Sequence, residues 1–176
     1  NADASSVFVS GGAVYTAGSE DNENSKSVAK VWKNDKVLYT LSDGKQNADA
    51  SSVFVSGSDV YTAGYEYNGN GKRVAKVWKN DKELYTRTQN TYVGSVCVWD
   101  GDVYVTVDGI VWKNGTALYS APGSYFLEVS VRDGDVYAAD WRNKESSIKI
   151  RKNDKELYSL SAGSIIKIFV YNGPER

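Results

Sequence analysis

The side chains that most often carry out catalysis are scarce in this chain. Its 176 residues include no histidine and no methionine, and Cys97 is the only cysteine. Without histidine the chain lacks the usual general base at neutral pH, which excludes a Ser/His/Asp device. It also lacks the commonest metal ligand, and soft metals find almost no donors. A single cysteine excludes an intrachain disulfide.

Carboxylates are the acid–base groups that remain, and Asp and Glu together number 22. Two of them could hydrolyse a glycosidic bond, but no spacing in the sequence singles out a pair. The run Glu20, Asp21 and Glu23 offers the oxygen ligands that Ca²⁺ prefers, without the order of an EF-hand loop. We therefore predict a solvated turn there, and we expect no catalytic residue, no metal site and no cofactor.

Aromatic side chains are the better candidates, because they gather in the segments that vary while the rest of the sequence repeats. Flat rings stack on sugars, and aromatic and Arg side chains anchor protein interfaces. Such variable segments are where function is grafted onto a repeated scaffold. Phe126 also lies in them, and each ring could instead cover the edge of a sheet. The candidate ligand-binding residues are Tyr65, Tyr67, Tyr92, Tyr125, Trp141 and Arg142.

The scaffold itself is an internal repeat. The phrase NADASSVFVSG occurs at residues 1–11 and again, letter for letter, at residues 47–57. A second phrase closes each unit as VWKNDKVLY, VWKNDKELY, VWKNGTALY and IRKNDKELY. We divide the chain into four complete repeats, and the strand-like SIIKIFVYNG begins a partial fifth. Their boundaries are 1–46, 47–90, 91–124, 125–163 and 164–176.

Within each repeat the pattern predicts four short antiparallel strands. Segments rich in Val, Tyr, Phe and Thr alternate with turns that contain Gly or Asn, as in SVFVS and AVYTA. Asn34-Asp35 and Asn114-Gly115 are two-residue hairpin signals. No 3.6-residue apolar periodicity extends across these turns, so helices are not expected. Four strands every 40 or so residues are the signature of a β-propeller blade, and the predicted fold is an all-β propeller with one extra strand.

The order of these features resembles a WD40-type blade over nearly the whole chain. SVFVSGSDVYTAGYE resembles its first two strands, RVAKVWKND its third and KELYT its outer strand. The Gly-His pair is missing, and Trp-Lys-Asn stands where Trp-Asp would be, so the resemblance concerns architecture and not membership. The repeats also resemble in style those of bacterial surface propellers. That resemblance implies a secreted or cell-surface location.

Repetition predicts that equivalent positions pack in the same way between blades. Trp32, Trp78 and Trp112 should lie between sheets, and Arg151 replaces them in the fourth repeat. The extra strand leaves three arrangements open. The chain is part of a larger ring, or its last strand latches onto the first repeat, or two copies complete one ring.

The balance of charge limits the partners. With 21 basic and 22 acidic residues the net charge is −1, and no apolar stretch reaches the ~20 residues of a membrane helix. We expect no nucleic acid, since Lys30, Lys33, Lys76 and Lys79 should form a solvated edge. The leading hypothesis is a non-enzymatic scaffold that binds a protein or glycan on its loop-bearing face. The alternatives are a carboxylate-based glycosidase or lyase and a structural segment of a larger surface protein.

Overall fold

The computed structural model describes residues 1–87, 91–142 and 147–161, and this part of the chain is all-β without helices. Sixteen strands form four antiparallel sheets of four strands each, so the prediction of four-stranded antiparallel sheets is confirmed. In every sheet the strands are neighbours in chain order. The predicted fifth-repeat strand within residues 164–176 lies outside the described residues.

The sheets are numbered here along the chain. Sheet 1 contains β1 (Ala2–Ser10), β2 (Ala13–Asp21), β3 (Ser27–Lys33) and β4 (Lys36–Thr40). Sheet 2 contains β5 (Ala48–Ser56), β6 (Asp59–Tyr67), β7 (Arg73–Lys79) and β8 (Lys82–Arg87). Sheet 3 contains β9 (Val93–Trp99), β10 (Asp102–Val107), β11 (Ile110–Lys113) and β12 (Thr116–Ser120). Sheet 4 contains β13 (Tyr125–Arg132), β14 (Asp135–Arg142), β15 (Ser147–Lys152) and β16 (Lys155–Ser161).

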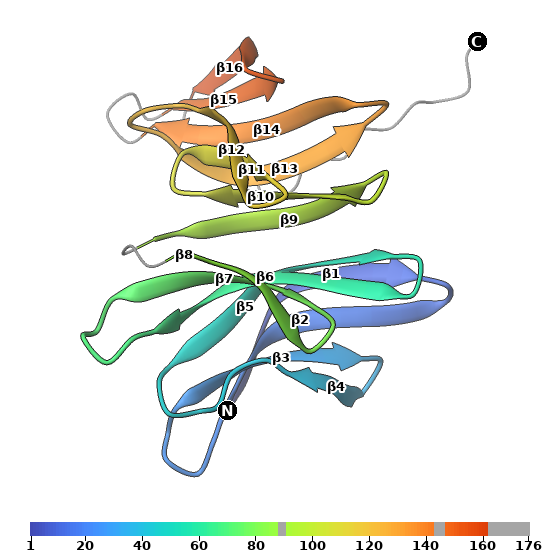
Figure 1. Cartoon of the computed structure of the whole chain (residues 1–176), viewed down its shortest axis with the longest axis vertical. Coiled ribbons are helices and arrows are strands. Elements are labelled where there is room, and N and C mark those ends of the chain that lie inside the picture. The colour runs from blue at the N-terminus through green and yellow to red at the C-terminus, as the bar shows by residue number, and fades with distance from the viewer. Residues whose placement is uncertain (88–90, 143–146, 162–176) are drawn as a thin grey trace.

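The four sheets follow one another along the long axis of the molecule in chain order (Figure 1). Sheet 1 lies at one end and sheet 4 at the other. The first strand of each sheet contacts the first strand of the next, so β1 packs beside β5, β5 beside β9 and β9 beside β13. Each pair of successive sheets therefore buries one face of each member.

Three apolar clusters fill the spaces between successive sheets. Between sheets 1 and 2, Tyr15, Ala17 and Val31 of the first sheet meet Val53 and Val55 of the second. The same kinds of residue recur between sheets 2 and 3 and between sheets 3 and 4. Each sheet thus has a valine-rich face toward the preceding sheet and a Tyr/Ala/Val face toward the following one, which explains why the sequence repeats.

The three tryptophans that were predicted to lie between sheets differ in their environments. Trp78 is fully buried between sheets 1 and 2, and Trp112 is half-buried against the next cluster. Trp32 is half-buried on the valine-rich face of sheet 1. In sheet 4 the equivalent Arg151 donates its Nε–H to the fully buried Asp140 at 2.5 Å. The fourth sheet therefore uses an ion pair where the others use an indole ring, as the substitution indicates.

Asparagine closes the outer hairpin of every sheet. Asn80 has a φ of 59°. Its side-chain Oδ1 accepts a hydrogen bond from the backbone N–H of Val60 at 2.9 Å, and its backbone N–H donates to the Val60 carbonyl at 2.7 Å. Asn34, Asn114 and Asn153 occupy the same position with positive φ. Asn tolerates this left-handed backbone better than most residues, so the predicted turns form.

Candidate functional site

Two kinds of connection meet at one end of the sheets. In sheet 1 the turn between β2 and β3 contacts the connection to sheet 2, since Asn22 Nδ2 donates to the Gly44 carbonyl at 3.0 Å. In sheet 3 the connection that precedes β9 is hydrogen-bonded to the β10–β11 turn, because the backbone N–H of Tyr92 donates to Asp108 Oδ1 at 2.7 Å. The variable segments therefore share one face, which we call the loop face.

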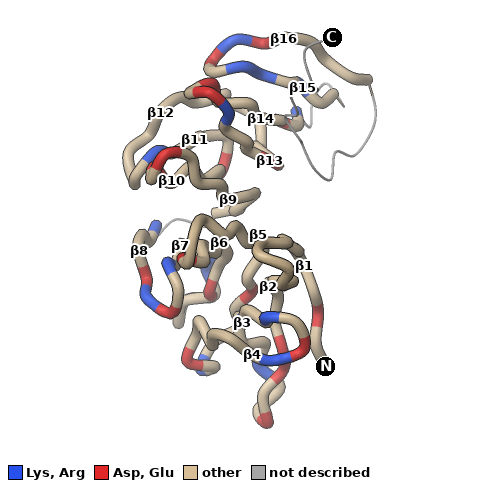
Figure 2. Tube along the Cα trace, turned by 90° about the vertical axis from the view of Figure 1, so that its right-hand side faces the viewer, with Lys and Arg blue, Asp and Glu red and all other residues tan. Residues whose placement is uncertain are grey.

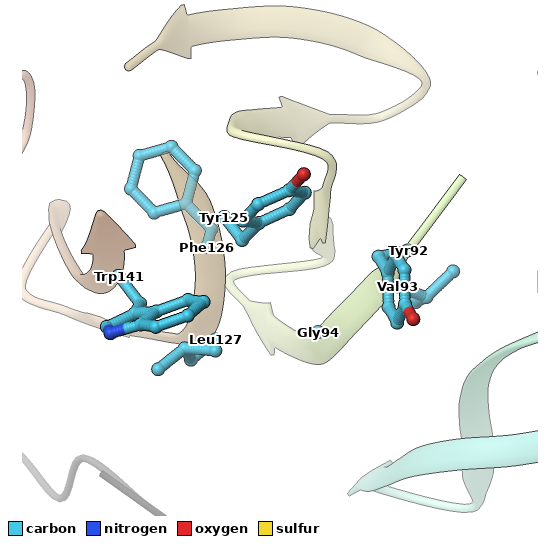
Figure 3. A pocket seen from close by; sticks show the side chains of 7 residues that line it. All are labelled: Tyr92, Val93, Gly94, Tyr125, Phe126, Leu127 and Trp141. Carbon is cyan, nitrogen blue, oxygen red and sulfur yellow. The ribbon is translucent and has the colours of Figure 1, made fainter. Parts of the chain in front are cut away.

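A cavity of about 580 Å³ opens on the loop face between sheets 3 and 4. Its volume falls in the range of small-molecule sites, and its lining is largely aromatic and aliphatic. Three of the predicted residues line it, and Figure 3 shows the ring of Tyr125 between those of Trp141 and Tyr92. The lining residues are Tyr92, Val93, Gly94, Tyr125, Phe126, Leu127 and Trp141.

The strand register explains why these three rings converge. Tyr125 begins β13 and is paired across the sheet with Trp141 near the end of β14. Tyr92 immediately precedes β9 of the neighbouring sheet, and its ring lies 6.1 Å from that of Tyr125 in an edge-on arrangement. Tyr92 is 61% exposed and Tyr125 is 44% exposed. Two large rings at the mouth of a cavity are thus available to a ligand.

The other two predicted tyrosines join Tyr92 through Arg73. Tyr65 and Tyr67 lie on β6, with ring centroids 5.7 Å apart. The guanidinium of Arg73 lies 4.4 Å from the Tyr65 ring and 4.7 Å from the Tyr92 ring, and Arg73 Nε donates to the Tyr67 hydroxyl at 3.0 Å. Cation–π contact of this kind orders the rings around the charge.

Together these contacts make one continuous surface feature, which we call the aromatic strip. It runs across the ends of sheets 2, 3 and 4. Its members are Tyr67, Tyr65, Arg73, Tyr92, Tyr125 and Trp141.

Two of the residues singled out from the sequence do not belong to the strip. Arg142 is held beside the cavity, because its Nε donates to the Ser124 hydroxyl at 3.0 Å and lies 4.0 Å from Asp140 Oδ2. Phe126 also lies in a variable segment, but it is buried, with its ring centroid 5.8 Å from that of Tyr119. Phe126 thus belongs to the core between sheets 3 and 4, although it is also one of the residues that line the cavity.

Sequence reasoning missed Arg73, and a comparison of the first two repeats contains the signal for it. In sheet 1 the equivalent pair is Ser27 and Asp21, whose side chains are hydrogen-bonded at 3.0 Å. In sheet 2 the paired residues are Arg73 and Tyr67. Asp21 and Ser27 of the first repeat are thus replaced together by Tyr67 and Arg73 in the second, and this paired difference is visible in the sequence.

The Tyr65 phenol of the strip is a neutral donor near neutral pH. Partial burial raises the pKa of the Tyr65 hydroxyl above its usual range, and the nearby carboxylate of Asp49 raises it further. A neutral phenol can both donate and accept a hydrogen bond. The strip therefore offers hydroxyl groups at the edges of apolar rings.

A second cavity of about 230 Å³ lies along the first strands of the sheets. Serines line most of it, including Ser6, Ser52 and Ser95. Among the lining residues that the structure describes, Glu128 is the one carboxylate. The paired carboxylates that a glycosidase would need do not meet here, and this cavity therefore offers no support for the enzymatic alternative.

Charge on the molecule is dispersed, as Figure 2 shows for the turns and outer strands of all four sheets. Lys30 and Lys76 are less solvated than expected, since each is only about a fifth exposed and pairs with Glu20 or Glu66 across its sheet. In residues 1–87, 91–142 and 147–161 no group of three metal-ligating side chains occurs. The same residues form no helix long and apolar enough to cross a membrane.

Comparison with known proteins adds no relative. No protein-family model matches the chain, and a search of curated proteins returns no match. The geometry of the loop face is therefore the basis for a functional argument.

Proposed function

We propose that this chain is a β-propeller-type binding module that holds a glycan on its loop face. The observation that carries the proposal is the aromatic strip, in which five rings and one guanidinium follow one another from sheet 2 to sheet 4. The propeller assignment is supported by four successive four-stranded antiparallel sheets whose first strands are adjacent.

A glycan fits the chemistry of the strip better than a compact apolar ligand does. The faces of pyranose rings carry C–H groups that pack on aromatic rings, while their hydroxyls need donors and acceptors at the ring edges. Trp141 and Tyr125 provide apolar rings at the cavity, and Tyr92 and Arg73 extend the surface toward sheet 2. An extended β-1,4-linked chain, whose successive sugars present flat faces, is the ligand class that this arrangement favours.

A protein partner is the second candidate, and Arg73 is the observation that favours it. Tyr, Trp and Arg are enriched in the centres of protein interfaces, where they contribute most of the binding energy. Arg73 contacts three tyrosine rings on an exposed face. This surface would suit an acidic or proline-rich segment.

The test is titration calorimetry of the chain with cellohexaose, in parallel with a proline-rich decapeptide. We expect saturable binding of cellohexaose that weakens at least tenfold in W141A and in Y92A. Leu118→Ala, an exposed change on β12 of sheet 3, is the matched control and should bind as the parent does. Binding of the peptide alone would move the function to the protein class. Binding of neither probe, or equal binding in all variants, would contradict the proposed glycan site.

A further inference from the structure

A row of hydrogen-bonding side chains crosses the first strands of all four sheets. Ser52 on β5 pairs across its sheet with Ala63 of β6. Glu128 on β13 pairs with the equivalent alanine, Ala139 of β14. A carboxylate therefore occupies the position of the serine in sheet 4. We call this set of residues the inner row, and its members are Ser6, Ser52, Ser95 and Glu128.

The three serines of the inner row accept hydrogen bonds from the sheet that follows. Ser52 Oγ accepts the backbone N–H of Val96 at 3.1 Å. Ser95 Oγ accepts that of Val129 at 2.7 Å. In residues 1–87, 91–142 and 147–161 none of the three hydroxyl groups donates to an acceptor. Ser52 and Ser95 are buried, where an unpaired donor is costly, and each can still donate one hydrogen bond.

All members of the inner row line the cavity of about 230 Å³. Ser5 and Ser51 line it too, but both donate to the carboxylate of Asp49, at 3.4 and 3.1 Å. Among the described lining residues the side-chain donors that remain are those of the inner row, while Val7 and Leu127 add apolar surface. Pockets for drug-sized ligands have volumes of about 300–1,000 Å³, so this smaller cavity suits a single ring. A sugar ring has hydroxyl groups at its edge and C–H groups on its faces, which matches this lining.

The cavity of the inner row adjoins the aromatic cavity. Gly94 and Leu127 line both of them, and Figure 3 shows Leu127 beside Trp141. A glycan that lies along the aromatic strip therefore reaches the inner row where the two cavities meet. Glu128 is only 7% exposed. A carboxylate at this depth suits the end of a chain better than an internal sugar, which continues in both directions.

We propose that the inner row binds the terminal sugar of a glycan whose other residues lie on the aromatic strip. This inference rests on the proposed function and narrows its ligand class from β-1,4-linked chains in general to the ends of such chains. Glu128 accepts hydrogen bonds from two adjacent hydroxyl groups of the terminal sugar, because a carboxylate has two accepting oxygens. The hydroxyls of Ser52 and Ser95 donate to oxygen atoms of the same sugar.

The test compares cellohexaose with hydroxyethyl cellulose of high molecular mass, a polymer in which chain ends are rare. Calorimetry measures binding of the first ligand, and affinity electrophoresis measures binding of the second. We expect E128Q to bind cellohexaose at least about tenfold more weakly than the parent, because a charged acceptor is lost. E128Q should bind the polymer as the parent does, since internal sugars contact the strip alone. Glu156→Gln, the same change at an exposed position of β16, is the control and should match the parent with both ligands.

A second variant, E128S, carries the residue that the other three sheets have at this position and should behave as E128Q does. Circular dichroism and urea unfolding check that both variants fold. If W141A weakens the binding of cellohexaose but E128Q and E128S do not, the inference is overturned and the proposed function stands. Equal weakening of oligomer and polymer by E128Q would overturn it too, because such an effect does not depend on chain ends. If the parent does not bind cellohexaose at all, the proposed function fails and this inference fails with it.

Discussion

The backbone amide of Val53 donates to the hydroxyl of Ser6 at 3.2 Å, across the interface between sheets 1 and 2. The same bond recurs from Val96 to Ser52 at 3.1 Å and from Val129 to Ser95 at 2.7 Å. A serine in the first strand of sheets 1, 2 and 3 (Ser6, Ser52 and Ser95) therefore fixes the register of the sheet that follows. Apolar packing alone has no such directional element.

Replacement of this serine should destabilise the chain without disturbing either sheet internally. In S52A the buried Val96 amide loses its acceptor, and we expect the free energy of unfolding to fall by about 1–3 kcal/mol. Urea unfolding followed by circular dichroism measures the change. S159A, at an exposed position of β16, is the matched control and should lie within about 0.5 kcal/mol of the parent. Equal stability of S52A and S159A would mean that the inter-sheet bond contributes nothing.

The ion pair of sheet 4 gives a second prediction. Asp140 is fully buried and the Arg151 side chain is only 12% exposed, so removal of one partner leaves the other charge uncompensated. D140A should therefore cost about 3–5 kcal/mol of unfolding free energy. At the equivalent positions sheets 1 and 2 carry Gly and Trp, as in Gly64 and Trp78.

The double variant D140G/R151W, which places the Gly and Trp of sheets 1 and 2 at these two positions, should be more stable than D140A. It removes both buried charges and supplies an apolar ring. Thermal unfolding of the single and double variants side by side measures the difference. If the double variant proved less stable than D140A, the ion pair would be required by the local shape of sheet 4 rather than by its charges.

Gly64 gives a third prediction, because the backbone of β5 passes directly over it. A Cβ at this residue would lie 2.0 Å from the Asp49 carbonyl oxygen, next to an irregularity in the pairing of β5 with β6. G64A must displace that strand, and overpacking of this kind costs about 1–3 kcal/mol. At Gly69, by contrast, a Cβ would meet nothing within 4 Å. Urea midpoints of G64A and G69A should therefore differ, and identical midpoints would show that β5 moves aside freely.

Most of the fold could be predicted from the sequence because the same pattern of strand-forming and turn-forming residues recurs in each repeat. Alternating Val, Tyr and Thr define the strands, and Asn34 or Asn80 marks the outer turn. Exposure could not be predicted in the same way. Val9 and Val55 have identical sequence neighbours but opposite burial, because burial depends on whether another sheet covers that face. Periodicity defines a face and does not say what lies against it.

In the candidate site too, the residue types could be predicted from the sequence, whereas the burial and contacts of each side chain could not. Tyr92, Tyr125 and Trp141 could be selected as aromatic residues in variable segments, and the structure brings them to one cavity. Phe126 satisfied the same criterion but points into the core, since alternate residues of a strand face opposite sides. Arg73 could be found only by asking which substitution accompanies Tyr67 across the strand pair.

A last relationship is present in three sheets and missing from the first. Asp59 accepts hydrogen bonds from Lys79 at 2.8 Å and from Asn80 at 3.0 Å, and Asp102 and Asp135 repeat this arrangement. These bonds, first from lysine and then from asparagine, lower the pKa of each Asp carboxyl. Sheet 1 keeps Lys33 and Asn34 but has Ala13 at the position of the aspartate.

Ala13→Asp should therefore stabilise sheet 1, and the gain should depend on pH. A carboxyl whose pKa is lower in the folded chain stabilises the fold fully above its unfolded pKa of about 3.9. The gain is lost as the pH falls through the lower, folded value. We expect A13D to have a higher urea midpoint than the parent at pH 7, with the difference vanishing in the acid range below about pH 4. A13N, which keeps the shape without the charge, should show no such pH-dependent gain. Equal midpoints of A13D and the parent at pH 7 would show that the exposed carboxylate is too well screened to stabilise the turn.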